Sequence, residues 1–472
     1  MARQLRAEFA GSIPVSTSSS GLSTVLTNVN NAFSGKTSGI DVASTVAALM
    51  QLQEEPLTQM QSQQSAVQLQ ISTLGSIASE LSQLQTAAND LKDSFGALSQ
   101  KTVTSSDPTL VTATAQNSAI LGTHAVVVSQ LATTSSSYSD PISDPTTLAG
   151  TTLTINYGDP NNPTKADTIT LPGTIKTLQD VADAINNSAQ NTGVTASVIT
   201  DATGQRLALV SKDSGAAGNL TVGGAVTFHQ GQAGQDAILS VDGVPVDSPS
   251  NTVTGIDGLT FTLTGADKNT TVQIGVSPDT TTAATAVNNF VTAYNNIMQG
   301  INAQYTPDSS GNLGPLESDA ALRTLQTQML ELAGYSVTGL GQYVNLQSMG
   351  VEMQNDGTLQ LNSDTLQDAL ENHYSDFQNF FQSTQGYGQA IGNMLLQITD
   401  PTQGTVSVDV AGLQSENSDL SQQITNFQDR MNTVQQQLTD KYSQLNVLLQ
   451  QYPQQIADIN SQLAALNPNS KS

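Results

Sequence analysis

The sequence predicts an α+β multidomain protein in which terminal heptad helices form a coiled-coil stalk. The middle of the chain is predicted to form a mixed helical/β core domain and a β-rich head. Three observations lead to this prediction. Apolar residues recur at alternating spacings of three and four near both ends of the chain. Residues 102–276 are rich in alternating Thr, Ser and Val, a pattern typical of strands. The chain of 472 residues is long enough for roughly three or four domains.

Composition restricts the partners and the chemistry. Fourteen Lys and Arg against 39 Asp and Glu give a net charge of −25. We therefore expect no nucleic-acid partner, because phosphate binding needs clustered Lys and Arg. The absence of cysteine excludes a disulfide framework and a thiolate metal site. No apolar run reaches 18 residues, so we expect no membrane span.

The first part of the chain predicts no packed structure. Residues 1–39 are rich in Ser, Thr, Gly and Asn, with too few apolar residues to form a core. They also lack the apolar run of a conventional secretory signal. We expect a disordered N-terminal leader.

Residues 40–100 are predicted to form the N-terminal stalk helices. Asp41 and Ser44 are candidate caps of a first helix, and Pro56 ends or restarts it. Beyond Pro56 a strict heptad pattern places apolar residues on one narrow stripe. The stripe positions are Leu74, Ile77, Leu81, Leu84, Leu91, Phe95 and Leu98.

The middle of the chain is predicted to contain two nested parts. Residues 101–135 and 277–404 are assigned to one core domain, strands in the first piece and helices in the second. Residues 136–276 are assigned to a β-rich head with two subdomains. Within the head, residues 151–224 read as strands, one helix and a hairpin.

Residues 405–466 are predicted to form one C-terminal coiled-coil helix, followed by a disordered tail over 467–472. A stripe as narrow as a heptad seam needs another helix to cover it. Either the two terminal helices cover each other within one chain, or each packs on copies in neighbouring subunits, and both arrangements can hold along different parts of the stalk. The seam positions are Leu413, Leu420, Ile424, Phe427, Met431, Val434, Leu438, Leu445 and Leu448.

Two polar residues interrupt this C-terminal seam. Asn417 and Lys441 occupy positions that are otherwise apolar. A polar residue at such a position can fix the register or the number of helices in a coiled coil. The alternative is that the helix frays and these residues are simply solvated.

The sequence contains no recognisable catalytic or metal-binding motif. His124, His229 and His373 are far apart in unrelated contexts, and the chain has no P-loop and no nucleophile elbow. The segment around Asp356 is similar to a calcium loop, but Ser363 stands where the bidentate Glu is required. We therefore expect no enzyme activity, no catalytic residue, no metal site and no cofactor.

Several segments, in order, resemble signatures of the bacterial flagellar filament-capping protein, which is also called the second hook-associated protein. The resemblance covers residues 39–466, and residues 174–222 are also similar to a small repeat of flagellin and hook-associated proteins. The leader before Gly39 is longer than the family leads us to expect. The matching segments are SGIDVASTVAALMQLQEEPL, GTHAVVVSQLA, SNTVTGIDGLTFTLTG, VNNFVTAYNNI, SMGVEMQNDGTLQLNSDTLQDAL and RMNTVQQQLTDKYSQLNVLL.

The resemblance implies a structural cap at the tip of the flagellar filament, beneath which flagellin folds and polymerises. It implies a homo-oligomer of about four to six subunits, with flagellin, flagellar junction proteins and an export chaperone at the C-terminal region as further partners. It also implies secretion through the flagellar type III apparatus to an extracellular position on the bacterial flagellum. An alternative function, adhesion to host glycan or mucin through the head, stays open.

Overall fold

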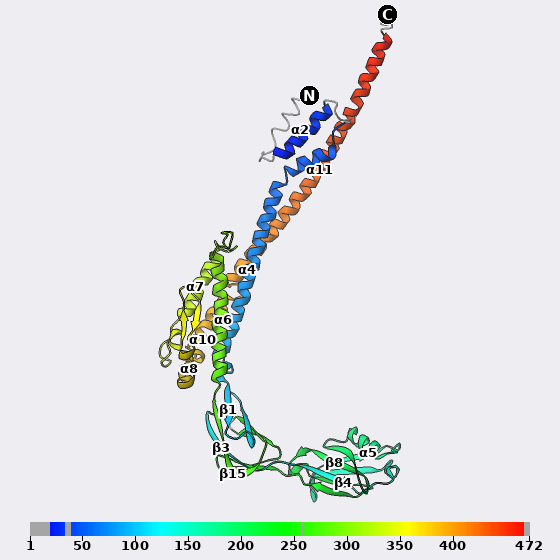
Figure 1. The fold of residues 1–472 in the computed structure, drawn as a ribbon, viewed down its shortest axis with the longest axis vertical. Helices are drawn as coiled ribbons and strands as arrows, with labels where there is room; N and C mark the ends of the chain where they lie inside the picture. Colours follow the sequence, from blue (N-terminus) through cyan, green and yellow to red (C-terminus); the bar gives the residue numbers. More distant parts are fainter. Residues whose placement is uncertain (1–18, 34–38, 257, 467–472) are drawn as a thin grey trace.

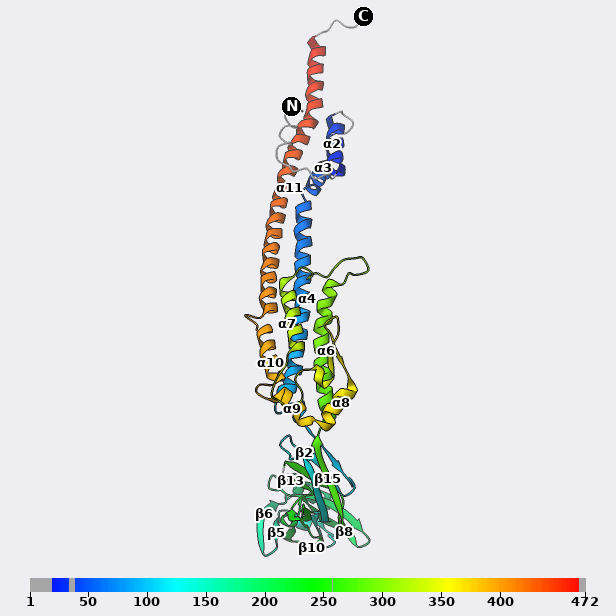
Figure 2. The same cartoon turned by 90° about the vertical axis from the view of Figure 1, so that its left-hand side faces the viewer.

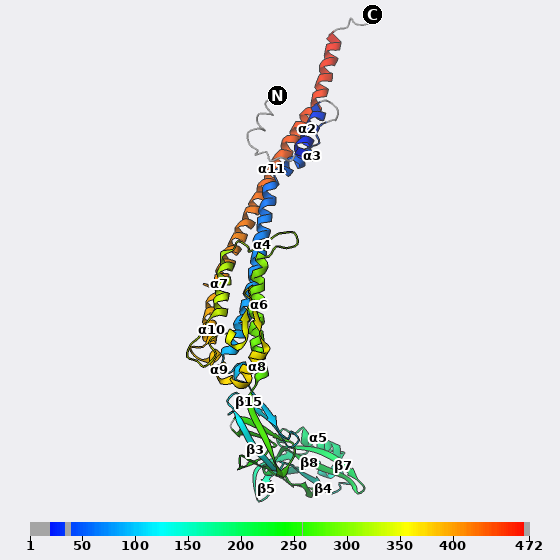
Figure 3. The same cartoon turned by 60° about the vertical axis from the view of Figure 1, so that its left-hand side comes forward.

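The computed structural model describes residues 19–33, 39–256 and 258–466. The expectations for residues 1–18 and for the tail at 467–472 lie outside these residues. The described part is elongated, with helices along most of its length and strands at one end (Figure 1). In two further views, α11 (Thr405–Leu466) runs beside α4 (Glu55–Lys92) and continues past it (Figures 2 and 3).

Among the described residues, two short helices precede α4. The first, α2 (Ser19–Phe33), shows that the expected disorder of residues 1–39 is wrong over these fifteen residues, because Val25 and Val29 find an apolar surface to cover. The second, α3 (Val42–Gln51), begins where Asp41 Oδ1 accepts a hydrogen bond from the Ser44 backbone N–H at 3.2 Å. Pro56 then lies in the first turn of α4, where its missing N–H costs nothing.

A helical core surrounds the second half of α4. Tyr294 and Tyr387 are fully buried in this core, and their hydroxyls donate to the carbonyl oxygens of Met329 and Leu332 at 3.1 Å and 3.0 Å. Burial raises the pKa of both hydroxyls, so they stay protonated donors. The other elements of this core are α6 (Thr280–Tyr305), α7 (Ala320–Gly334), β16 (Val351–Met353), β17 (Leu359–Leu361), α8 (Ser363–Asn372), α9 (Tyr374–Gln382) and α10 (Tyr387–Ile398).

The first β unit follows the helical core. Two antiparallel sheets enclose a core that includes Val126, Phe261 and Ile274. One sheet has the strand order β1 (Lys101–Ser105), β15 (Asp267–Pro278), β3 (Gly122–Gln130), β11 (Ala237–Val241) and β12 (Val244–Ser248). The other has the order β13 (Thr252–Ile256), β14 (Leu259–Leu263) and β2 (Val111–Ala115).

This unit groups the chain differently from the sequence prediction. Residues 101–130 were assigned with the helices, whereas β1 and β3 both pair with β15 and β2 pairs with β14. The reason is that these strands bury one face only, and the complementary strands lie at residues 237–278. Pairing across roughly 140 to 180 residues follows from no local pattern.

The second β unit is the part farthest from the stalk. Its helix α5 (Leu178–Asn186) begins with a capping box between Thr177 and Asp180 and buries Val181 and Ile185 against the strands. One sheet has the order β10 (Phe228–Gln232), β4 (Thr134–Ser139), β8 (Gly204–Ser214) and β7 (Val194–Asp201). The other has the order β6 (Asn162–Thr170), β5 (Thr152–Asp159) and β9 (Leu220–Gly223).

A buried polar cluster fixes the α5–β7 loop to the β5–β6 hairpin. The Tyr157 hydroxyl donates to Asp167 Oδ2 at 2.7 Å, and the Thr192 N–H donates to the same oxygen at 2.9 Å. Burial and the Asp167 carboxylate together raise the pKa of Tyr157. The hydroxyl therefore remains a donor, and the carboxylate is satisfied inside the fold.

Replacing Leu84 by Ala tests whether α4 is the centre of the helical core. Leu84 is fully buried, so the substitution should lower the free energy of unfolding by about 2–5 kcal/mol through lost burial and a cavity. Leu69→Ala on the same helix is the matched control, because Leu69 is 55% exposed, and it should cost less than about 1 kcal/mol. Urea unfolding followed by circular dichroism measures both. Equal losses in the two variants would contradict the assignment.

Candidate functional site

The C-terminal apolar stripe is covered along its first part and uncovered along its last part. Leu420, Ile424 and Met431 are buried, and Leu448 is 57% exposed. The stripe positions between these extremes are half-buried: Leu413, Phe427, Val434, Leu438 and Leu445.

The cover on α11 comes from α4 and α3 of the same chain. Val46 and Met50 of α3 form a cluster with Met431 of α11, and Phe427 and Val434 pack against it. Nearer the helical core, Leu413 packs against the main cluster. The sequence left open whether the terminal helices pair within one chain or between subunits. The structure of one chain contains the first of these arrangements.

A close contact fixes the register of α3 against α11. The Ile40 N–H donates to Asn446 Oδ1 at 2.9 Å. Gly39 has φ of +149°, and a Cβ at this position would overlap the Asn446 side chain. Asn446 lies outside the heptad seam positions, so the sequence pattern gave no reason to select it.

The N-terminal stripe is buried against the helical core. Leu74, Ile77, Leu81, Leu84 and Leu91 are at most 2% exposed. They contribute to the same cluster as α6 and α10, so α4 belongs to the core as well as to the stalk.

The last two predicted positions of the N-terminal stripe are not on the helix. The helix ends at Lys92, where Asp93 adopts an extended conformation and its Oδ1 accepts from the Phe95 N–H at 2.9 Å. Leu98 is fully buried on a short 3₁₀ turn, and Phe95 is 80% exposed. The heptad pattern extends to Phe95 and Leu98 because it depends only on the spacing of apolar residues. It gives no information about the turn that Asp93 forms after Lys92.

The two polar residues of the C-terminal seam have different surroundings. Asn417 is half-buried and its Oδ1 has no hydrogen-bond partner among the described residues, whereas Lys441 is exposed. Near Lys441 the contact face has shifted by one position, so that Tyr442 packs on α3 instead. A straight helix drifts by about 20° per heptad, which accounts for this shift.

Beyond α3, the end of α11 presents apolar side chains to solvent. Leu448, Tyr452, Ile456, Ile459 and Leu463 recur at spacings of four, four, three and four. All five are more than half exposed. We call these residues the terminal stripe. Between Tyr442 and Leu466 the only charged residue is Asp458, so the surface around the terminal stripe carries little charge.

A buried carboxyl lies where α11 leaves the helical core. Asp409 Oδ2 is buried and lacks a hydrogen-bond partner among the described residues. Burial, together with the carboxylate of Asp319 at the start of α7, raises the pKa of Asp409 to about 6. This junction therefore carries an electrostatic cost at neutral pH.

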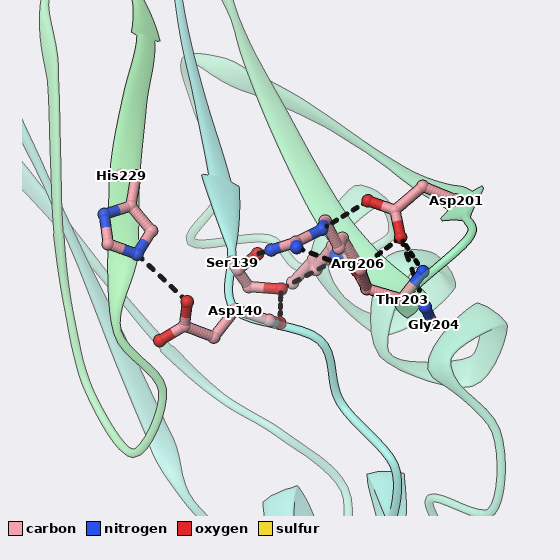
Figure 4. Close-up of polar contacts among 8 residues, drawn as sticks. Ser139, Asp140, Asp201, Thr203, Gly204, Arg206 and His229 are labelled. Atoms are coloured by element: carbon pink, nitrogen blue, oxygen red, sulfur yellow. Dashed lines mark hydrogen bonds and ion pairs between the residues drawn. The ribbon is translucent and has the colours of Figure 1, made fainter.

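On the second β unit, polar side chains cross-link β4, the β7–β8 turn and β10 (Figure 4). Arg206 donates from Nε to Asp201 Oδ2 at 2.8 Å and from Nη1 to the Ser139 carbonyl oxygen at 3.0 Å. Hydrogen bonds from Thr203 and Arg206 hold the pKa of Asp201 well below its ordinary value. In the same view, His229 Nε2 lies 3.0 Å from Asp140 Oδ1. These contacts rigidify the end of the sheet.

The histidines lie apart in the fold. His124 Nδ1 lies 2.7 Å from Asp242 Oδ2 in the first β unit, and His229 lies in the second. His373 joins α8 to α9, where its carbonyl oxygen accepts from Phe377 N–H. No group of three or more His, Asp or Glu side chains in the described ranges is placed to hold a metal ion. Within the same ranges, no helix combines the length and apolar character that a membrane crossing requires.

Comparison with known proteins places this architecture. Residues 38–135 match the family model "Flagellar hook-associated protein 2 N-terminus" and residues 234–454 match "Flagellar hook-associated protein 2 C-terminus". The flagellar hook-associated protein 2 of Escherichia coli K12 is 32% identical over 371 residues, which cover 71% of this chain and 77% of that protein. This chain belongs to the flagellar hook-associated protein 2 family.

Other members of the flagellar hook-associated protein 2 family agree with this assignment. The B-type protein of Pseudomonas aeruginosa is 29% identical over 390 residues, covering 75% of this chain and 80% of that protein. The crystal structure of the D1-D2-D3 domains of the flagellar cap protein FliD from E. coli has a TM-score of 0.59 and 26% identity, covering 72% of this chain and 99% of that chain.

The two matched regions lie on either side of the second β unit in the sequence. The two family models cover the stalk, the helical core and the first β unit, and the gap between them contains most of the second β unit. Within that gap, residues 152–213 match the flagellin hook IN motif. Helix α2 lies before the first matched residue.

Replacing Asp409 by Asn tests the buried carboxyl at the α7–α11 junction. The folded-state pKa lies above the ordinary value of 3.8, so between about pH 4 and pH 6 the folded protein binds more protons than the unfolded chain. The stability of the parent protein therefore falls as pH rises through this window. At pH 7 the neutral Asn should stabilise the protein by about 1 kcal/mol, after allowance for partial solvent screening.

Urea unfolding at pH 7 and near pH 4.5 measures this effect, which should shrink at the lower pH. Asp419→Asn is the control, because Asp419 is exposed on the same helix, and it should have little effect at either pH. A stabilisation by Asp409→Asn that grows on acidification would contradict the analysis.

Proposed function

We infer that this protein works in the bacterial flagellum as a structural cap at the distal tip of the filament, assembled from several copies of this chain. The observation that carries the proposal is the terminal stripe, which lies at the end of α11 far from the β units (Figure 1). The family membership supplies the flagellar setting. No catalytic step is assigned to the protein.

The physical case for self-association rests on uncovered apolar surface. Five large apolar side chains in one row are unusual on a helix that works alone in water, because each loses the benefit of burial. Packing the stripe on its equivalent in another copy would bring few like charges together, since Asp458 is the only charged residue nearby. We propose that the terminal stripe is an intersubunit coiled-coil seam.

The same argument applies to Asn417. Its Oδ1 is buried without a hydrogen-bond partner on the described residues, and such an atom carries a desolvation cost of about 1–3 kcal/mol. A donor from a neighbouring subunit would remove that cost and fix the register of the seam. We propose this role for Asn417, and we give no such role to the exposed Lys441.

In the proposed assembly about four to six subunits form a ring. The stalks point toward the filament, the β units form a plate, and flagellin folds and polymerises beneath that plate. The remaining proposed contacts are with flagellar junction proteins and, before type III export, with a chaperone at the C-terminal region. The protein would then act outside the cell.

Adhesion through the head is not adopted as a second function. The charged side chains of the cluster in Figure 4 are paired with one another: Arg206 with Asp201, and His229 with Asp140. These pairs cross-link strands and a turn of the second β unit. No observation on the described part of the head favours a glycan or mucin ligand over this structural role.

Charged substitutions in the terminal stripe test the cap. The double variant Leu448→Asp/Ile459→Asp should abolish the discrete oligomer measured by light scattering, because two carboxylates per chain would be buried at the seam. In a strain lacking its own cap protein, it should also fail to restore motility and should release flagellin into the medium. Removing whole helices would be a poorer test, since α4 belongs to the helical core.

Gln450→Asp/Gln454→Asp adds the same charge to the same part of α11 at exposed polar positions, and serves as the matched control. It should behave as the parent chain in both assays. A parent chain that is monomeric at every concentration, or a stripe variant that still restores motility, would contradict the proposed seam.

A further inference from the structure

Helix α2 forms a small helix-docking surface with the end of α3 and with α11. Val25 is buried and Val29 half-buried against Ala48 and Leu49 of α3 and against Leu438 and Tyr442 of α11. On the same face Asn28 Nδ2 donates to Ser44 Oγ at 2.8 Å. We call the α3 and α11 side of this contact the tip surface. The figures place α2 beside the part of the stalk far from the β units (Figures 1 and 3).

The sequence of α2 is poorly suited to an independent helix. Its fifteen residues, SSGLSTVLTNVNNAF, contain no charged residue and are rich in Ser, Thr, Asn and Val. These residues have low helix propensity, and an isolated helix of this length is marginal even for good formers. Docking on the tip surface therefore holds α2 in its helical form. Because the contact is small, α2 can leave the tip surface at little cost.

The connection between α2 and α3 allows α2 to reach beyond its own chain. Residues 34–38 join Phe33 to Gly39. At about 3.3–3.6 Å per residue this connection spans at most about 20 Å. In a ring of copies whose stalks lie side by side, that reach extends to the tip surface of an adjacent copy, because packed helices lie about 8–10 Å apart.

We propose that α2 is an exchangeable helix, which docks on its own tip surface in the free chain and on the tip surface of a neighbouring copy in the assembled protein. The partner that α2 binds in the assembly is a second copy of this chain. That copy presents the same residues that α2 already contacts, namely Ala48, Leu49, Leu438 and Tyr442. Exchange keeps the contacts of α2 and changes only which copy supplies the tip surface. Swapping an identical element in this way links copies at low cost.

This proposal rests on the proposed self-association and adds a second kind of link to it. The terminal stripe would join copies through α11, and α2 would join adjacent copies around the ring. In a ring, each α2 is held close to the tip surface of the adjacent copy, so the effective concentration of that surface is high. Docking between copies then needs no surface other than the one that α2 already uses. Helix α2 also lies outside the residues matched by the two family models, so the family match does not supply this link.

The absence of cysteine allows a direct test by covalent trapping. In the full chain carrying Asn28→Cys and Ser44→Cys, a disulfide can form where α2 is docked, since these two side chains are in hydrogen-bond contact. The chain is oxidised at the concentration at which light scattering shows the oligomer, and is then denatured and run without reductant. Exchange predicts covalent dimers and higher multiples that reductant returns to single chains.

Leu26→Cys with Ser44→Cys is the control pair, because Leu26 is 50% exposed on α2. It should give few covalent multiples. An oligomer in which the Asn28–Ser44 pair forms only bridges within one chain, or no bridge at all, would overturn the exchange and leave the self-association standing. A chain that is monomeric at every concentration would overturn both proposals.

A second variant tests the exchange without a disulfide. Val25→Asp/Val29→Asp should weaken the oligomer about tenfold, which corresponds to about 1.4 kcal/mol, because α2 can no longer dock. Leu26→Asp adds charge to the exposed face and should leave the dissociation constant within about twofold. Equal dissociation constants for the two variants would overturn the exchange.

Discussion

The rest of the structure depends on the burial of one face of α4. This helix packs against α6 and α10 in the helical core and against α11 in the stalk. Burying Leu74, Leu81 and Leu84 therefore stabilises the core and positions the stalk at the same time. Each such side chain contributes about 1.5–3 kcal/mol of burial free energy relative to exposure, so the rigid base of the stalk is set by the core.

The helical parts of the fold were predictable because their signals are local. The apolar spacing, the cap at Asp41 and Pro56 in the first turn of α4 all lie within a few residues of the features that they specify. The prediction failed at two kinds of feature: a helix end that a single turn determines, and a strand whose pairing partner is distant in the sequence. An Asp turn stops α4 before Phe95, and β1 and β3 pair with a strand roughly 140 to 180 residues away along the chain. Neither effect alters the heptad or strand pattern from which the prediction was made.

The contacts of α11 with α3 were predictable in part. The heptad pattern selected the α11 residues that meet α3, among them Met431 and Leu438, but it could not follow the drift of a straight helix, which exposes Lys441 and brings Tyr442 into contact. The docking of α2 was missed because its composition is typical of disorder. The pair Val25 and Val29, four residues apart, was the one signal in the leader.

The charged residues of α11 are concentrated in the part that packs against its own chain, and this distribution bears on the proposed self-association. Between Asp409 and Lys441 the helix carries seven of its eight charged residues and lies against neighbours in its own chain. Beyond Tyr442 it carries Asp458 alone, with an apolar stripe flanked by Gln, Ser and Asn. Side-chain charges beside a seam are what restrict helices to one partner and one register. A seam without them is held by burial alone, and burial is not directional. In the proposed assembly, the terminal part of the stalk would therefore accept and release a helix of another copy at a lower cost than the charged part would.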